Sequence, residues 1–159
     1  MELKTRIRAG LLVASAACIA TIASLEGFSS VPYKDIAGVW TYGFGETSNV
    51  KPDIKITRAE GMKILERSVK KHEKGLSCIK DVPLYQHEYD AYVTTAYNIG
   101  TTAFCNSSMV KYLKQGKYKE ACNAITRWNK ARVKGKLVVV NGLVKRREKE
   151  KKMCLGETK

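Results

Sequence analysis

The feature that most constrains this chain is a stretch without a charged residue, 17 residues long, that runs from residue 9 to residue 25 and ends directly on Glu26. Lys4, Arg6 and Arg8 precede it, and basic residues ahead of an apolar stretch orient it with the N-terminus in the cytoplasm. As a helix the stretch would be about 25 Å long, short of a hydrocarbon core of ~30 Å. Ala, Ser, Thr and Gly outnumber the larger aliphatic residues in it. The sequence therefore predicts an export element that anchors weakly in a membrane.

Three fates are open to this segment. A cleaved signal peptide would use small-residue sites at 15–17 or 21–23, but it would leave Glu26 close to a frayed new terminus. A lipoprotein site at Cys18 has Ser15 where a large aliphatic residue is expected. The third fate is a temporary anchor that later leaves the membrane and joins the fold. We favour it, with residues 1–25 as the signal-anchor segment and residues 26–159 as one folded domain.

The charge of the chain restricts its partners. Lys and Arg number 29 against 15 Asp and Glu, so the net charge is +14, and the excess is concentrated toward the C-terminus. Such a field favours nucleic acid, phospholipid head groups or an anionic cell-wall polymer. Charge alone does not choose between these. The basic run at 145–152 is typical of a solvated helix face.

Residues 28–56 are short apolar pieces between Gly, Pro, Ser and Asn, which predicts a small antiparallel sheet. Thr57 and Glu60 have capping-box spacing ahead of a helical stripe that extends to about Lys74. Pro83 is expected to open a further helix that Gly100 ends. Shorter helices are expected at 107–114 and 118–128, and a last one at 142–154. The predicted fold class is α+β and mainly helical, with a small antiparallel sheet lobe and a helical lobe around a cleft.

The cysteines indicate an oxidising compartment, because five occur in a chain that carries an export element. Four of them lie in the folded part and allow three connectivities. Our hypothesis pairs Cys122 with Cys154, since both lie on helices of the second lobe on either side of Trp128. This leaves Cys78 with Cys105 and puts Cys18 outside both pairs.

We expect neither a metal site nor a cofactor. The sequence has no Cys-x-x-Cys pair, and its two histidines, His72 and His87, are isolated. Zinc sites are built from several Cys and His ligands at short spacings.

Glu26, Asp35 and Thr41 form a possible catalytic set. Glycoside hydrolysis needs one protonated carboxyl group that gives its proton to the leaving oxygen and one ionised carboxylate. Glu26 follows an apolar helix, which favours its neutral form, whereas Asp35 follows Tyr33 and Lys34 in a more polar setting. Thr41 offers a hydroxyl to hold the attacking water. Spacing alone is weak evidence, since two acids and a threonine at such intervals are common.

The surrounding residues strengthen this interpretation. Glu26-Gly27, Pro32 to Asp35 and Gly38 to Gly45 closely resemble the active-site segment of phage-type lysozymes, glycoside hydrolase family 24. The resemblance continues at Tyr97 to Gly100, at Arg127-Trp128 and at Gly142 to Glu148, and so covers the chain from about Leu25 to Leu155. The apolar N-terminus further resembles the signal-anchor-release endolysins of that family.

The resemblance implies a phage-lysozyme-like fold and hydrolysis of the β-1,4 bond between N-acetylmuramic acid and N-acetylglucosamine in peptidoglycan, causing host cell lysis. It makes Glu26 the general acid, Asp35 the second carboxyl group and Thr41 the hydroxyl that orients water. Substrate contacts are expected at Gly45, Tyr97 and Asn98, and a contact with Glu26 is expected from Arg146 or Arg147. One departure is Glu46, where the family often has His, which puts the support of that turn in doubt.

The resemblance also implies where the protein acts. It would be held in the host inner membrane through residues 9–25, with its N-terminus in the cytoplasm, and would reach the periplasm after release. We expect a monomer that binds peptidoglycan and no nucleic acid.

Two alternatives stay open at this point. A non-catalytic, membrane-anchored basic protein that binds the cell wall would explain the charge equally well, but not Glu26, Asp35 and Thr41 in their local settings. A transglycosylase would cleave the same bond without water, and Thr41 favours hydrolysis over it.

Overall fold

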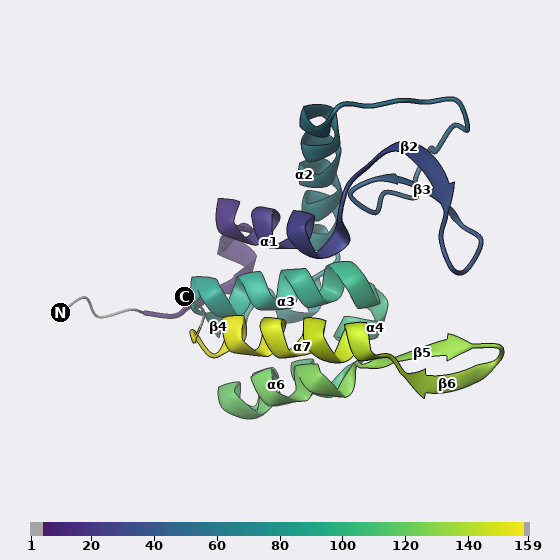
Figure 1. Cartoon of the computed structure of the whole chain (residues 1–159). Coiled ribbons are helices and arrows are strands. Elements are labelled where there is room, and N and C mark those ends of the chain that lie inside the picture. Colours follow the sequence, from purple (N-terminus) through teal and green to yellow (C-terminus); the bar gives the residue numbers. More distant parts are fainter. Residues whose placement is uncertain (1–4, 158–159) are drawn as a thin grey trace. The chain divides into compact units, whose positions relative to one another are not determined.

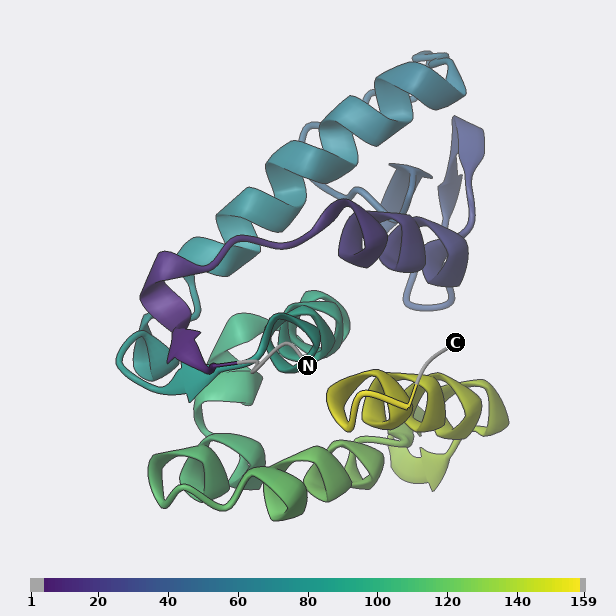
Figure 2. The same ribbon diagram turned by 90° about the vertical axis from the view of Figure 1, so that its left-hand side faces the viewer.

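The computed structural model describes residues 5–157, so Lys4 of the predicted export element lies outside the described residues. The chain forms two compact units. The sheet unit comprises residues 16–71, and the helical unit comprises the residues up to Ser15 together with the chain from His72 onward. Each unit is described by itself below, and Figures 1 and 2 show the elements within each.

The sheet unit contains one two-stranded antiparallel sheet and two helices. Its elements in chain order are α1 (Ala16–Glu26), β2 (Ser29–Lys34), β3 (Trp40–Gly43) and α2 (Arg58–Lys74), whose last turn belongs to the helical unit.

The helical unit holds five α-helices, three short 3-10 helices and two small antiparallel sheets within the described residues. In chain order they are β1 (Ile7–Arg8), η1 (Ala9–Leu11), η2 (Ser77–Ile79), β4 (Pro83–Leu84), α3 (Gln86–Ile99), α4 (Thr101–Cys105), α5 (Ser108–Lys114), α6 (Tyr118–Ala124), η3 (Ile125–Arg127), β5 (Lys130–Val133), β6 (Lys136–Val139) and α7 (Asn141–Cys154). β1 pairs with β4, and β5 pairs with β6.

Aromatic packing against α2 forms the core of the sheet unit. The rings of Phe28 and Phe44 lie 5.1 Å apart, and Phe44 is 2% exposed. Gly61 of α2 makes room for them, because a Cβ at this position would lie only 2.8 Å from the Phe28 ring. The Arg58 guanidinium lies over both rings, 5.6 Å from Phe28 and 5.3 Å from Phe44. The end of α1 and the end of β3 are therefore fixed to the same helix.

α3 is the central helix of the helical unit. Nine consecutive residues of α3, Glu88 to Ala96, are buried, which is the pattern of a helix surrounded by protein. α7 packs against α3, and α6 packs against α7, as Figures 1 and 2 show. The core of this unit thus lies around α3.

Arg6 and Arg8 are built into the helical unit. Both Nε and Nη2 of Arg6 donate to the buried Glu88 carboxylate at 3.0 Å. The guanidinium also lies over two rings, 4.3 Å from Tyr85 and 3.6 Å from Tyr118. The hydrogen bonds to Glu88 raise the pKa of Arg6 above its ordinary value. Arg8 pairs with Asp81 at 2.7 Å.

The uncharged stretch does not form one continuous helix. It begins with η1, continues without regular structure from Leu12 to Ser15, and becomes helical only in α1. Its backbone between residues 9 and 15 makes hydrogen bonds with more distant parts of the helical unit. Among residues 5–157, no helix combines the length and the apolar character needed to cross a membrane.

The helix predictions are mostly confirmed. Thr57 and Glu60 form the expected capping box, since Thr57 N–H donates to Glu60 Oε1 at 3.0 Å and Glu60 N–H donates to Thr57 Oγ1 at 3.1 Å. Hydrogen bonds from the backbone N–H and hydroxyl of Thr57 lower the pKa of Glu60. The predicted helix start at Pro83 is wrong, because Pro83 lies in β4 and α3 begins at Gln86. Proline is tolerated there since, among residues 5–157, β4 pairs with β1 alone.

Two disulfides lie in the helical unit, between Cys78 and Cys105 and between Cys122 and Cys154. This is the pairing that the sequence predicted. Cys18 lies outside both disulfides and is buried. The hydroxyl of Tyr92, whose pKa is raised by burial, lies 3.3 Å from Cys154 Sγ. The second disulfide therefore ties α6 to α7 beside the central helix.

Candidate active site

Glu26 is held at the junction between α1 and the sheet. It is the last residue of α1 and is half-buried. The helix ends because Gly27 follows, with its N–H donating to the carbonyl of Ala23 at 3.0 Å. The carboxyl group lies against Gly45, where an added Cβ would stand 3.0 Å from Glu26 Oε2. Gly45 has φ +81°, a left-handed conformation that favours glycine. The contact of Gly45 with this carboxyl group is thus a reason for glycine at this position.

Asp35 is positioned by the turn between β2 and β3. Its backbone N–H donates to the carbonyl of Val39 at 3.0 Å, and its Oδ1 accepts from Val39 N–H at 2.8 Å. Asp is a preferred turn residue because its side chain accepts hydrogen bonds from the backbone a few residues on. The residue is exposed, so its carboxyl group is both oriented by the turn and open to a ligand.

Thr41 lies on β3, directly across from Tyr33 on β2. It is buried, with 4% of its surface exposed. Its hydroxyl donates to the carbonyl of Val39 at 3.0 Å. The hydroxyl proton is therefore engaged, and the oxygen keeps lone pairs that can accept a hydrogen bond from a further group.

The backbone of Val39 links Asp35 to Thr41. The N–H of Val39 binds the carboxyl group of Asp35, and its carbonyl accepts the hydroxyl of Thr41. Glu26 joins the same unit through its contact with Gly45, two residues beyond the end of β3. The three predicted catalytic residues thus share one compact unit. The linking role of Val39 could not be read from the sequence, because it rests on the backbone and not on a side chain.

Glu46 supports the turn that follows β3. Its backbone forms two hydrogen bonds with Tyr42, at 2.9 and 3.0 Å. Its Oε1 accepts from the N–H groups of Thr47 and Ser48 at 3.0 and 2.9 Å. Glu46 therefore stabilises the turn that carries Gly45.

The predicted substrate residues Tyr97 and Asn98 belong to the helical unit, whereas Gly45 belongs to the sheet unit. The Tyr97 ring packs on His72 with centroids 4.7 Å apart. The side-chain oxygen of Asn98 accepts a short hydrogen bond from Arg147 Nη2. Their contact with substrate stays a prediction.

Arg147 connects three of the sequence motifs. Besides Asn98 at the end of α3, it donates to the carbonyl of Trp128 at 2.8 Å and to Glu150 Oε1 at 2.6 Å. Glu150 is fully buried and also accepts from Arg146 Nε at 3.2 Å. Arg147 thus has a structural role, because it connects the end of α3 to Trp128 and Glu150. The expected contact of Arg146 or Arg147 with Glu26 involves residues of different units and stays a prediction.

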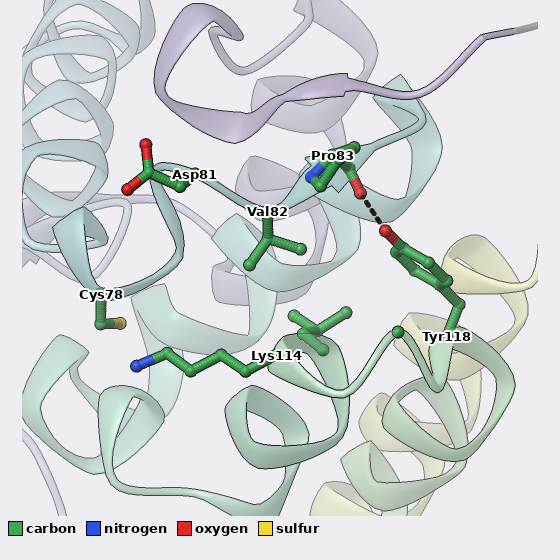
Figure 3. Close-up of a pocket in the computed structure, with 8 residues that line it drawn as sticks. Cys78, Asp81, Val82, Pro83, Lys114 and Tyr118 are labelled. Carbon is green, nitrogen blue, oxygen red and sulfur yellow. Dashed lines mark hydrogen bonds between the residues drawn. The ribbon is translucent and has the colours of Figure 1, made fainter.

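The helical unit also has a pocket of about 480 Å³ (Figure 3). Its described lining residues are Cys78, Asp81, Val82, Pro83, Leu113, Lys114, Gly116 and Tyr118. The Tyr118 hydroxyl donates to the carbonyl of Pro83 at 2.8 Å across one side of it. Asp81 is the only carboxyl group in this lining, and its Oδ1 already binds Arg8. The described lining of this pocket therefore lacks the pair of carboxyl groups that two-carboxyl chemistry needs.

The fold and this site define a class of protein, the lysozymes with a small sheet and a helical part. The model of the phage lysozyme family matches residues 23–150. The chain belongs to the phage lysozyme family. It is accordingly a muramidase, a glycoside hydrolase that acts on peptidoglycan.

Relatives and solved structures agree with this assignment. The chain is 37% identical over 126 residues to an endolysin of Acyrthosiphon pisum secondary endosymbiont phage 1, covering 79% of this chain and 86% of the relative. It is 36% identical over 142 residues to a SAR-endolysin of Pseudomonas phage phiKMV, covering 89% of this chain and 88% of the relative. The endolysin of Escherichia coli O157:H7 phage FAHEc1 superposes with a TM-score of 0.84 at 33% identity, covering 93% of this chain and 96% of that one.

Proposed function

We propose that this protein is an endolysin that hydrolyses the β-1,4 bond between N-acetylmuramic acid and N-acetylglucosamine with Glu26, Asp35 and Thr41, and that it is exported on a releasable membrane anchor. Glu26 donates a proton to the leaving glycosidic oxygen. Asp35 provides the negative charge that activates water or stabilises the positive sugar carbon. The observation that carries the catalytic part is the fixed placement of both carboxyl groups, Glu26 by Gly45 and Asp35 by Val39.

Different surroundings suit the two carboxyl groups to different roles. Glu26 is half-buried and lies at the end of a helix, whereas Asp35 is exposed in a turn and accepts a backbone hydrogen bond. A general acid needs a fixed position against the leaving oxygen, and a second carboxylate needs access to the sugar. The geometry supports Glu26 as the acid and Asp35 as the second carboxylate, and not the opposite assignment.

Thr41 orients the water as an acceptor. Because its hydroxyl already donates to Val39, the attacking water has to donate one of its protons to Thr41 Oγ1. The water then has a second proton for a carboxylate and a lone pair for the sugar carbon. This arrangement supports hydrolysis over transglycosylation, because transglycosylation uses no water.

Turbidity loss tests the catalytic assignment. Glu26→Gln should keep the fold and lose nearly all activity on outer-membrane-permeabilised bacteria, because an amide does not donate a proton as a carboxylic acid does. The matched control is Glu66→Gln, which removes a carboxylate from an exposed position of α2 in the same unit. Activity of Glu26→Gln close to that of Glu66→Gln, with both proteins folded, would show that Glu26 is not the acid.

The proposal of a releasable anchor rests on the hydrogen bonds of residues 9–15. The N–H groups of Ala9 and Gly10 donate to the carbonyls of Val82 and Lys80, both at 2.9 Å. Ala14 N–H donates to Glu73 Oε1 at 2.6 Å. In a bilayer, each of these N–H groups would have to bond within its own helix. The folded conformation and a membrane-spanning conformation of this segment therefore exclude each other.

The same contacts argue against an ordinary cleaved signal peptide. Ser15 donates to the Asp90 carboxylate from its N–H at 3.1 Å and from its hydroxyl at 2.5 Å. Cleavage after Ala17 or Ala23 would remove Ser15 and also Arg6, the partner of Glu88. Asp90 and Glu88 are 7% and 3% exposed, and the loss of hydrogen-bond donors from a buried carboxylate is destabilising. Retention of the segment leaves both satisfied.

The relatives named SAR-endolysins support the same proposal. According to this proposal, the protein is first held in the host inner membrane with its N-terminus in the cytoplasm. It is then released into the periplasm, where it acts as a monomer on peptidoglycan. While residues 9–25 lie in the bilayer, α1 is not in its folded place and Glu26 is not presented to Gly45, so the anchored form is inactive.

Leucine substitutions on the exposed face of α1 test the anchor. Ala17, Ala20 and Ser24 are exposed, so the folded form tolerates larger side chains there, while each added CH₂ favours the bilayer by about 0.8 kcal/mol. The triple Leu variant should stay in the membrane fraction and delay lysis. The control carries Gln at the same three positions and should be released at least as early as the parent. Release of the Leu variant on the parental schedule, or recovery of a parental protein that lacks residues 1–23, would refute the anchor.

A further inference from the structure

β5 and β6 form a two-stranded hairpin that the proposed catalysis does not use. We call residues 130–139 the basic hairpin. Its register pairs Lys130 with Val139, Ala131 with Val138, Arg132 with Leu137 and Val133 with Lys136. Figure 1 shows it extending away from the helices of its own unit.

The apolar side chains of the basic hairpin are unusually exposed for their type. Val133 is 46% exposed, Leu137 60% and Val139 58%. In a two-stranded sheet such residues would ordinarily be covered by a helix or a third strand, since an isolated hairpin is marginally stable in water. Clustered exposed apolar side chains mark interaction surfaces more often than single ones do.

The charge of the basic hairpin has one sign. Four of its ten residues are basic and none is acidic: Lys130, Arg132, Lys134 and Lys136. All four are exposed. The first acidic residue after the hairpin is Glu148. The partner that complements this surface is therefore anionic.

Basic and apolar side chains are mixed on both faces. Because side chains alternate along a strand, one face carries Lys130, Arg132, Leu137 and Val139, and the other carries Ala131, Val133, Lys136 and Val138. A flat protein partner would cover one face and leave the other exposed. A lipid interface accommodates both faces, since it takes up apolar side chains among the acyl chains and holds Lys and Arg at the phosphates.

The basic hairpin is also held in one conformation. Lys134 and Gly135 at the turn have φ +52° and +79°, the signs of a type I′ turn, which matches the twist of paired strands. Arg132 Nη1 donates to the Gly135 carbonyl at 3.3 Å. At the base, Val140 N–H donates to the carbonyl of Asn129 at 2.9 Å. A projection with a defined conformation loses less conformational entropy when it docks than a disordered segment does.

We propose that the basic hairpin docks on an anionic phospholipid surface. Charge complementarity selects an anionic partner, and the exposed valines and leucine select a lipid over a nucleic acid or a polysaccharide, neither of which offers an apolar phase for them. The inference does not depend on the catalytic residues or on residues 9–25.

Vesicle binding by the full chain tests the proposal. Vesicles of phosphatidylethanolamine and phosphatidylglycerol at a 7:3 ratio should bind the parent, and vesicles of phosphatidylcholine alone should bind it much more weakly. Each basic residue near an anionic surface contributes about fivefold to binding, so replacing the four hairpin bases with Gln should weaken binding about 600-fold. A charge-matched control replaces four exposed lysines elsewhere with Gln, namely Lys70, Lys119, Lys145 and Lys149. It should weaken binding by less than tenfold.

A second variant tests the apolar part. Val133→Thr, Val138→Thr and Val139→Thr together keep the branched shape and the positive charges, and should weaken binding about tenfold. Residues 9–25 are identical in the parent, the two hairpin variants and the lysine control, so any membrane affinity of that segment cancels in the comparison.

A position-specific probe shows whether the hairpin itself enters the interface. An environment-sensitive fluorophore on Leu137→Cys, in a Cys18→Ala background, should shift to the blue and brighten on the anionic vesicles. The same fluorophore on Lys119→Cys of α6 should not change. Equal responses at both positions, or parental binding by both hairpin variants, would overturn the proposal.

The other occupants are distinguishable outcomes. If the hairpin variants bound vesicles normally but lost binding to purified sacculi, the partner would be peptidoglycan and the lipid proposal would be wrong. If sedimentation showed a parental dimer that the Val→Thr variant converted to a monomer, with no effect on vesicles, the hairpin would join two copies of this chain.

Discussion

Gly45→Ala is the substitution for which the structure predicts the sharpest effect on activity. Gly45 has φ +81°, and an added Cβ would lie 3.0 Å from Glu26 Oε2. The left-handed conformation costs an alanine about 1–2 kcal/mol, so the free energy of unfolding should fall by about that amount. The Glu26 carboxyl group also has to retreat by a few tenths of an ångström, because 3.0 Å is closer than such contacts ordinarily are.

The expected loss of activity follows from that displacement. A misplacement of 1 Å in a catalytic arrangement can cost about a hundredfold in rate, so a shift of roughly half that size should cost about tenfold. The matched control is Gly116→Ala. Gly116 has φ +71°, and its added Cβ would meet nothing within 4 Å. The control carries the same backbone strain without a contact to Glu26.

The assay is the initial rate of turbidity loss for parent, Gly45→Ala and Gly116→Ala, each at a temperature where urea unfolding shows it to be fully folded. Both variants should be destabilised to a similar degree, and only Gly45→Ala should lose activity. Equal rates for the two variants would refute the argument that Gly45 positions Glu26.

Three further predictions concern stability. Glu150→Gln should lower the free energy of unfolding by about 3 kcal/mol in urea, because it leaves buried arginine charge uncompensated, whereas the exposed Glu148→Gln should change it by less than about 0.5 kcal/mol. Replacing Cys122 and Cys154 with Ser should cost about 4 kcal/mol, since the two lie 32 residues apart in sequence; an unchanged melting temperature would contradict this. The pKa of Glu60 is lowered by its hydrogen bonds from Thr57, so the capping box stabilises the protein at neutral pH and this stabilisation is lost as the pH falls through the lowered pKa. Glu60→Gln should therefore lose less stability than the parent over that acid range.

Local signals predicted most of the helices. The capping box placed the start of α2 correctly, and the helices around Ser108–Lys114 and Asn141–Cys154 were expected within one residue of where they begin. These signals are interactions between residues three or four apart, so a sequence carries them directly. The pairing of Cys122 with Cys154 was predicted from the expected position of both on helices of one lobe.

Two of the strands that were not predicted, β1 and β4, depend on partners distant in sequence, whereas the basic hairpin is local. Pro83 predicts a helix start because proline is typical of one, but it lies in β4, a strand that pairs with Ile7 and Arg8. The sequence does not predict the basic hairpin, because Lys134-Gly135 is a less common hairpin turn than Asn-Gly or Asp-Gly. The available signal was the β-branched residues on either side of Lys134-Gly135, namely Val133, Val138 and Val139.

The candidate site was predicted in its residues but not in its connections. Glu26, Asp35 and Thr41 come from the sequence and the family resemblance. That Val39 links Asp35 to Thr41 through its backbone, and that Gly45 lies against the Glu26 carboxyl group, follows only from the folded chain.

The measurement that tests the central claim most directly is digestion of purified peptidoglycan in H₂¹⁸O with mass analysis of the released fragments. Hydrolysis through Glu26, Asp35 and a water held by Thr41 predicts fragments that end in reducing N-acetylmuramic acid carrying one ¹⁸O, and none above background with Glu26→Gln. Fragments that end in 1,6-anhydro-N-acetylmuramic acid without ¹⁸O, or no fragments from the folded parent, would contradict the account.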